Sequence, residues 1–279
     1  MPTFEVSDLE DSRLVPYRNL RTVNWTGASG WFIAEGPLLV DRLLRSSYQV
    51  HSVMVSRKLL DKYSHQVSQD TGLIVVDDDA VSKIVGFNFH RGVMACGLRR
   101  PLLSPRETFT ETVSHETTLV AVQGVQDPEN LGGILRSCAA LGIEHVIVGP
   151  NSADPLSRRV LRVSMGTAFK LNLLRTRDLV ADLAWLRETW KVESIATTLA
   201  PDSEFLEQAA RRGPTVILLG NEAHGLPPEL QAAADRRVKI DMRLGTDSLN
   251  VSVAAGIVMH YFCRVASDKL RKSPSESNA

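Results

Sequence analysis

The sequence has little of what marks several large classes of protein. Its 279 residues include three scattered cysteines, Cys96, Cys138 and Cys263, without metal-ligand spacing. So few cysteines do not make a disulfide framework, and this favours a reducing cytoplasm. No apolar run approaches the roughly 18 residues that span a bilayer. Residues 1–10 are acidic and lack an apolar core, so we expect neither a secretory signal nor a membrane partner.

Excess charge of one sign is also missing, because 32 Lys and Arg residues balance 32 Asp and Glu residues. Nucleic-acid-binding proteins often carry an overall basic excess, so any basic surface here must be local. The best local candidate is 151–177, which holds one acid, Asp154, and six basic residues: Arg158, Arg159, Arg162, Lys170, Arg175 and Arg177. An ordinary solvated helix face explains this segment equally well.

Strand and helix patterns alternate regularly from about residue 117. The expected strands are 118–125, 145–148, 170–174, 193–198, 215–219 and 237–241, and the expected helices are 130–141, 178–190, 228–234 and 249–266. This alternation predicts an α/β domain whose mostly parallel sheet carries helices on both faces. Ligands of such sheets bind beyond the carboxyl ends of the strands. The loops after Val125, Leu219 and Asp241 are therefore the places to look for a site.

The first hundred residues mix helical and strand signals. Leucines at helical spacing occupy 36–46, and short β-branched runs occupy 51–55 and 73–76. Residues 99–116 are polar and contain two prolines, which is typical of a linker. We therefore expect domains at 1–100 and 117–270, a linker at 101–116 and a loose tail at 271–279.

The first segment with the composition of a site is 126–136. Pro128 and Asn130 end a strand and start a helix, and Asn130 is a suitable N-cap. Gly132 and Arg136 are four residues apart, so they share a helix face. The glycine clears space beside the arginine, whose planar fork of donors can bind phosphate. A capped helix with a surface arginine is the simpler alternative.

The second segment, 216–228, is a buried strand that runs into a glycine turn. Gly220 lets the backbone approach a ligand closely. Glu222 can accept hydrogen bonds or orient a neighbour. His224 is a candidate general base, although a single histidine in a loop is more often structural or solvent-facing.

The third segment, 239–254, is a strand, a glycine-containing loop and the start of a long helix. Either Ser248 or Asn250 begins that helix. Together with Ser252 they gather polar groups near a helix N-terminus, where backbone donors are free. A well-capped helix without any site explains the same pattern.

In order and spacing, the three segments together resemble the motifs of the SpoU family of SPOUT-class, TrmH-like RNA methyltransferases. The resemblance covers about 118–266, and 163–167 looks like the family's middle segment. Residues 32–36 and 90–92 are more weakly similar to a small RNA-binding domain that often precedes the catalytic one. Asp241 stands where many relatives have proline, and we expect it to leave cofactor binding intact.

The resemblance implies a C-terminal α/β domain with a deep trefoil knot, a small α/β RNA-binding domain before it, and a homodimer. It implies transfer of a methyl group from S-adenosylmethionine to a ribose 2′-hydroxyl in a structured rRNA or tRNA. The catalytic residues it implies are Arg136, Asn130, Glu222, Ser248 and Asn250. The cofactor-binding residues it implies are Leu219, Gly220, Asn221, Ile240, Met242 and Leu249. No metal-binding constellation is visible in the sequence.

Two other classes of function remain open. A catalytically silent RNA-binding protein on the same fold would not need Arg136, Glu222 and Asn250. A nucleotide-dependent enzyme of Rossmann type would need Gly-x-Gly-x-x-Gly after a strand, or a Walker loop, and neither occurs. The sequence leaves undecided the target RNA, the roles of His224 and Asp241, and whether Arg136 or a substrate phosphate serves as the base.

Overall fold

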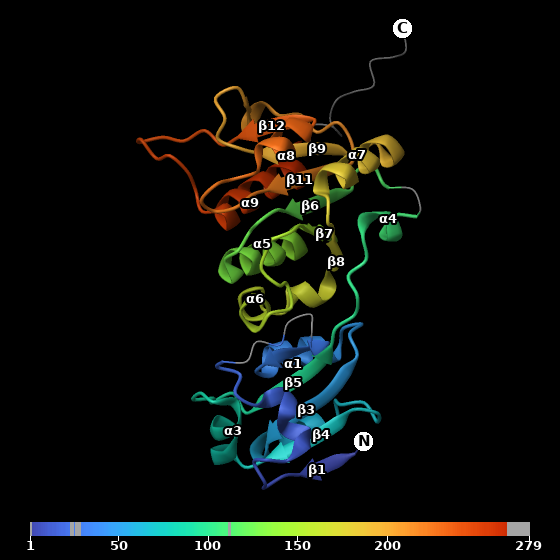
Figure 1. Cartoon of the computed structure of the whole chain (residues 1–279), viewed down its shortest axis with the longest axis vertical. Coiled ribbons are helices and arrows are strands. Elements are labelled where there is room, and N and C mark those ends of the chain that lie inside the picture. The colour runs from blue at the N-terminus through green and yellow to red at the C-terminus, as the bar shows by residue number, and fades with distance from the viewer. Residues whose placement is uncertain (1, 23–24, 26–28, 111–112, 267–279) are drawn as a thin grey trace. The chain divides into compact units, whose positions relative to one another are not determined.

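The computed structural model describes residues 2–22, 25, 29–110 and 113–266, which divide into two compact units. The first unit comprises Met1–Pro101 and Asp154–Lys170, and the second comprises Leu102–Ala153 and Leu171–Ala279. The expected tail at 271–279 lies outside the described residues. Each unit has its own sheet, and both are drawn in Figure 1.

The described part of the second unit contains a seven-stranded sheet in the order β10-β12-β9-β11-β6-β7-β8. Its strands are β6 (Thr118–Val122), β7 (His145–Val148), β8 (Asn172–Arg175), β9 (Glu193–Thr197), β10 (Glu204–Phe205), β11 (Thr215–Leu219) and β12 (Arg236–Lys239). Every neighbouring pair is parallel. The predicted α/β fold with a large parallel sheet is confirmed. The two-residue strand β10 was not predicted, because it is too short to show a pattern.

Helices cover this sheet. They are α4 (Pro105–Thr108), α5 (Pro128–Leu141), α7 (Leu179–Trp190), α8 (Pro228–Ala233) and α9 (Val251–His260), with η5 (Leu206–Gln208) and a π-helical turn, η6 (Tyr261–Val265). Leu183 of α7 and Leu230 of α8 share a buried core with Leu119 and Val216 of the strands. Side chains alternate along a strand, so the residues next to Leu119 and Val216 in β6 and β11 face the opposite side of the sheet. There α9 contacts β11 and packs along α5.

The strand order brings four loops to one edge of the sheet. Strands β12, β9, β11 and β6 are consecutive neighbours and run in the same direction. Their carboxyl ends therefore meet, and the loops that follow them can line one site. The sequence analysis named the loops after β6, β11 and β12. It missed the loop after β9, because hydrophobic periodicity shows where a strand is but not which strands are its neighbours.

The start of α5 differs from the prediction. The N-cap is Asp127, whose side chain accepts a hydrogen bond from the backbone N–H of Glu129 at 2.8 Å. Pro128 is the first helical residue, a position where its missing N–H costs nothing. Asn130 therefore lies inside the first turn, and its side chain is released from capping for contacts elsewhere.

The described part of the first unit contains a five-stranded mixed sheet in the order β1-β4-β3-β5-β2. Its strands are β1 (Thr3–Glu5), β2 (Trp31–Glu35), β3 (Val50–Ser56), β4 (Gly72–Val76) and β5 (Val93–Leu98). Its helical segments are η1 (Ser12–Tyr17), α1 (Pro37–Leu44), η3 (Arg57–Leu59), α2 (Leu60–Ser64), α3 (Asp78–Val85), α6 (Arg158–Val163) and η4 (Thr167–Lys170). The sequence patterns had indicated α1, β3 and β4.

The segment Asp154–Lys170 leaves the second unit after β7 and packs within the first. Arg158 of this segment forms an ion pair with the buried Glu35 at 2.9 Å, and the Phe169 ring lies 5.7 Å from that of Phe32. Asp154 pairs with Arg99 at 2.5 Å. Arg158 is thus a structural cation and not part of a free basic surface. The segment at 163–167, which resembles a catalytic-domain motif, belongs to this same packing.

The remaining expectations from composition concern cysteines, metals and membranes. All three cysteines are free, and burial raises the pKa of the Cys96 thiol to about 12. In the part of the chain that the structure describes, no cluster of His, Cys, Asp and Glu side chains is placed to hold a metal ion. The helices described here are also too short or too polar to cross a membrane.

Candidate active site

A chain of side-chain hydrogen bonds joins the three segments singled out in the sequence. The Nδ2 atom of Asn130, on α5, donates to Oε1 of Glu222 at 3.0 Å. The Nδ2 atom of Asn250, at the start of α9, donates to Oδ1 of Asn130 at 2.8 Å. The structure thus brings together three of the five predicted catalytic residues, and it ties α5, the loop after β11 and α9 to one another.

The Glu222 carboxylate is held by the start of α5. Besides Asn130, it accepts hydrogen bonds from the backbone N–H groups of Asp127 at 3.2 Å and Gln126 at 3.4 Å. Partial burial raises the pKa of Glu222, but the hydrogen bonds from Asn130 and the backbone outweigh it and leave the pKa below its ordinary value. A carboxylate stabilised in this way is a weak proton acceptor. Glu222 is therefore suited to positioning Asn130.

This arrangement makes a stability prediction for Glu222→Gln. The glutamine side chain has the same shape as glutamate, but its NH₂ group would face the N–H groups that donate to the carboxylate. We therefore expect the variant to be less stable at pH 7 by about 1 kcal/mol. The folded-state pKa of Glu222 is lowered, so the stabilisation exists above the unfolded-state pKa and is lost as pH falls through the folded-state pKa. Urea denaturation from pH 7 to pH 3 should show the gap between variant and wild type closing. A gap of constant size would contradict a role for the charge.

Asn250 has a second role as the N-cap of α9. Its Oδ1 atom accepts from the backbone N–H groups of Ser252 at 2.9 Å and Val253 at 3.4 Å, and from the Ser252 hydroxyl at 2.7 Å. The amide is thereby oriented from both ends. Of the two predicted helix starts, the structure selects Asn250, while Ser248 lies exposed in the preceding loop.

The close approach of α5 and α9 depends on Gly133. A Cβ atom at this position would lie 3.1 Å from Cβ of Ser252. The sequence analysis did not identify Gly133; it assigned Gly132, which is buried on α5, to clearing space beside Arg136.

Arg136, the fourth predicted catalytic residue, stands apart from the network. It is exposed in the third turn of α5. Within the described ranges, no hydrogen bond or ion pair joins it to Asn130, Glu222 or Asn250. The prediction that all five residues form one cluster is therefore not reproduced within this single chain, and the Arg136 guanidinium faces solvent.

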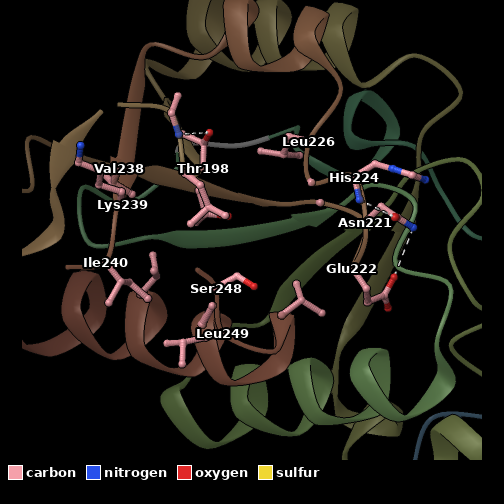
Figure 2. A pocket seen from close by; sticks show the side chains of 18 of the residues that line it. Thr198, Asn221, Glu222, His224, Leu226, Val238, Lys239, Ile240, Ser248 and Leu249 are labelled. Carbon is pink, nitrogen blue, oxygen red and sulfur yellow. Dashed lines mark hydrogen bonds between the residues drawn. The ribbon is translucent and has the colours of Figure 1, made fainter. Parts of the chain in front are cut away.

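A cavity of about 480 Å³ lies beyond the carboxyl ends of β9, β11 and β12. Five of the six predicted cofactor-binding residues line it: Gly220, Asn221, Ile240, Met242 and Leu249. Figure 2 shows Ile240 on one side of this cavity and Asn221 and Glu222 on the other. Glu222 and Ser248 belong to its lining, so the hydrogen-bond network and the cavity share a wall.

Leu219 is the predicted cofactor residue that does not line the cavity. Its side chain is fully buried in β11, and its carbonyl accepts a hydrogen bond from the backbone N–H of Gln123 at 2.9 Å. His224 does line the cavity, and its backbone N–H donates to Oδ1 of Asn221 at 3.1 Å. Asp241 is outside the lining, and its carboxylate lies 3.5 Å from Nε of Arg243.

Several lining residues were not predicted. They come from the end of β9 and the loop after it, from the loop after β11, from α8 and from α9, and they are Thr197, Thr198, Leu199, Ala200, Leu226, Gln231, Val251, Ala254 and Val258. The place of the β9 loop in the site depends on the strand order, which the sequence does not show.

Gly220 leaves room for the loop that follows it to fold back over the end of β11. A Cβ atom there would lie 2.2 Å from the carbonyl carbon of Gly225 and 2.3 Å from the backbone nitrogen of Leu226. The loop folds back because Asn221 and Gly225 exchange two backbone hydrogen bonds, each of 2.9 Å. Close approach of the chain's own backbone is thus a second reason for this glycine, besides the predicted close approach of a ligand.

Comparison with known proteins agrees with this geometry. Residues 117–260 match the SpoU rRNA Methylase family. An uncharacterized tRNA/rRNA methyltransferase of Mycobacterium tuberculosis is 32% identical over 265 residues, which cover 92% of this chain and 90% of that protein. The 23S rRNA (guanosine-2′-O-)-methyltransferase RlmB of Acinetobacter baylyi is 32% identical over 67% of this chain and 75% of its own. The AdoMet-bound rRNA methyltransferase of Sinorhizobium meliloti has a TM-score of 0.79 at 26% identity, covering 94% of this chain and 98% of its own.

Proposed function

The chain belongs to the SpoU rRNA Methylase family, and we propose that it transfers a methyl group from S-adenosylmethionine to a ribose 2′-hydroxyl of rRNA or tRNA. The observation that carries this proposal is the shared wall between the Asn130–Glu222–Asn250 network and the cavity. The activities printed for the relatives from Acinetobacter and Sinorhizobium support the same reaction class. Free cysteines support a reducing cytoplasm as the place where it acts.

The residues around the cavity suit S-adenosylmethionine. A volume of about 480 Å³ falls in the range of small-molecule sites. Ile240, Met242 and Leu249 offer apolar surface to a flat base, and Gly220 brings its backbone to the same cavity. When bound, this cofactor supplies a methyl group that its sulfonium charge has already activated.

The protein then has to align the ribose hydroxyl and assist the departure of its proton. Alignment contributes several kcal/mol in favourable cases, roughly 7–11 for ideal geometry. Proton transfer to a positioned group adds about 10²–10⁴-fold. Asn130, Glu222 and Asn250 keep the wall of the cavity in place. Arg136 grips a phosphate beside the target ribose through its planar fork. Because arginine is normally protonated, Arg136 contributes by orienting the hydroxyl toward the methyl group, and the released proton passes to solvent.

Two measurements test this function. Calorimetry should show binding of S-adenosylmethionine and no binding of nicotinamide cofactors. Incubation of ribosomal RNA and tRNA with methyl-labelled cofactor should place the label in 2′-O-methylated nucleosides. Cofactor binding without any transfer would identify a catalytically silent protein, and label on a base would contradict the ribose assignment.

We propose that the protein is a homodimer through α9. On its outer side Val253 and Ile257 are 51% and 40% exposed, and a Cβ atom at Gly256 would meet no neighbour within 4 Å. Apolar surface of this kind is a common mark of an interface.

Light scattering should therefore give about twice the chain mass of 30.7 kDa. Val253→Asp should shift the protein toward monomer, because the carboxylate would be buried in the interface. The control variant Glu129→Asp, a conservative change at the start of α5, should leave the mass measured by light scattering unchanged. A wild-type monomer with full activity would contradict this assembly.

We also propose the trefoil knot that the family resemblance implies. The path of the chain supports this proposal. Strand β12 is separated from β11 by β9, yet the helix that follows β12, α9, packs against β11 and α5. The path of residues 240–266 through the second unit in a crystal structure would test the knot directly.

We propose that the first unit binds the RNA substrate. The two stretches that resemble an RNA-binding domain, 32–36 and 90–92, meet in space, since a Cβ atom at Gly36 would lie 2.7 Å from Cδ of Arg91. The backbone N–H of Gly36 also donates to the carbonyl of Val93, the residue after the second stretch, at 2.9 Å. Arg91 is exposed and offers its guanidinium to a phosphate.

Arg91→Glu should weaken RNA binding about tenfold while leaving S-adenosylmethionine affinity unchanged. Loss of one phosphate contact should also reduce the slope of log affinity against log salt by about one. Removal of everything before Pro105 is a poorer test, because it would uncover the apolar side of Asp154–Lys170. Unchanged RNA affinity and salt slope in Arg91→Glu would remove this residue from the RNA contact.

A further inference from the structure

Gln231, on α8, connects two loops of the cavity that are otherwise separate. Its Nε2 atom donates to the carbonyl of Leu226, in the loop after β11, at 2.7 Å. Its Oε1 atom accepts from the hydroxyl of Thr198, in the loop after β9, at 3.1 Å. All three residues line the cavity, and Figure 2 shows Thr198 and Leu226 along its upper side.

The chemistry of the partners fixes the orientation of the Gln231 amide. The Leu226 carbonyl can only accept, so it must face the amide nitrogen. The Thr198 hydroxyl oxygen already accepts a hydrogen bond from the backbone N–H of Ala200 at 3.1 Å. Its own proton is therefore available to the amide oxygen. Neither a carboxylate nor an apolar side chain of the same size can make both contacts.

The loop held by Gln231 has little room to shift. Its Gly225–Leu226 backbone lies directly over Gly220, at the distances where a Cβ atom would clash. Leu226 itself is buried in the core beneath α8. On the Thr198 side, the backbone N–H of Thr198 donates to the Val238 carbonyl at 3.0 Å, but the next residue, Leu199, is 58% exposed and lines the cavity. Gln231 thus anchors an exposed loop to a fixed one.

We infer that Gln231 is a positioning residue for the cofactor: it holds the Thr198–Ala200 loop against the Leu226 carbonyl in the arrangement that binds S-adenosylmethionine. This inference rests on the proposed function. It assigns to Gln231 an effect on cofactor affinity and none on the methyl-transfer step, because the hydrogen bonds of Gln231 go to Thr198 and Leu226 and not to Glu222 or Asn130.

The test is Gln231→Glu, which preserves size and places a carboxylate oxygen against the Leu226 carbonyl. Calorimetry should show S-adenosylmethionine binding weakened about tenfold or more. At saturating cofactor the single-turnover rate should stay within about twofold of wild type, and KM for RNA should not change. Gln208→Glu, an equal change of charge at an exposed residue outside the cavity lining, should bind like wild type.

A double-mutant cycle distinguishes positioning from general destabilisation. Thr198→Val and Gln231→Leu each remove one side of the same contact, so their effects on cofactor affinity should be less than additive. Thr198→Ser keeps the hydroxyl and should retain affinity. Normal S-adenosylmethionine affinity in Gln231→Glu, or full additivity in the cycle, would overturn the inference. Failure of the wild-type protein to bind S-adenosylmethionine would instead overturn the proposed function.

Discussion

Arg136→Ala is expected to reduce methyl transfer by about 10²-fold or more at saturating cofactor. The proposed role of Arg136 is to grip a phosphate beside the target ribose, and alanine removes the donors. Arg136→Lys should fail nearly as badly, because lysine keeps the charge but loses the planar fork. S-adenosylmethionine affinity should be unchanged in both variants, since Arg136 does not line the cavity.

An exposed arginine without a catalytic role behaves differently. Its replacement typically changes stability by no more than about 0.5 kcal/mol and leaves activity intact. Arg212→Ala, at an exposed arginine before the amino end of β11, is the matched control and should transfer methyl groups at the wild-type rate. If Arg136→Ala also does so in single-turnover experiments, the assignment of Arg136 is wrong.

Gly220→Ala is expected to abolish measurable S-adenosylmethionine binding. The new Cβ atom would lie 2.2 Å from the backbone of Gly225, so the loop 221–226 must move away from β11. That loop contributes Asn221, Glu222 and Leu226 to the cavity. Overpacking of this kind costs about 1–3 kcal/mol of stability, so the variant should also melt at a lower temperature while remaining folded at 25 °C.

Gly213→Ala is the matched control for this prediction. Gly213 lies before the amino end of the same strand, and a Cβ atom there would be 3.6 Å from Nε2 of His115, an ordinary van der Waals distance. Calorimetry and thermal denaturation of both variants provide the comparison. Wild-type affinity in Gly220→Ala would show that the loop is free to move without loss of the binding site.

Local patterns in the sequence predicted much of the second unit. Strands β7 and β11 begin and end at the predicted residues, because short buried runs of β-branched and aliphatic residues stand between clear breaks. The parallel sheet followed from strand–helix alternation. The fold brings together Asn130, Glu222 and Asn250, three of the residues that the family resemblance implies to be catalytic, and their mutual contacts could not be read from spacing.

What the sequence did not show depends on contacts between distant segments. The role of Gln231 follows from β9 lying beside β11, and that adjacency leaves no local pattern. The helix α6 has an apolar side like any other helix, so nothing indicated that it packs in the first unit. Gly220 was recognised as necessary, but its partner, the Gly225–Leu226 backbone, appears only once the loop is folded.

Mapping 2′-O-methylated nucleotides in the rRNA and tRNA of cells with and without the gene tests the central claim most directly. The account predicts at least one ribose that is methylated only when the gene is present. A wild-type copy should restore that methylation, and an Arg136→Ala copy should not. An identical set of 2′-O-methyl sites in both cells, together with no transfer by the purified protein to either RNA, would contradict it.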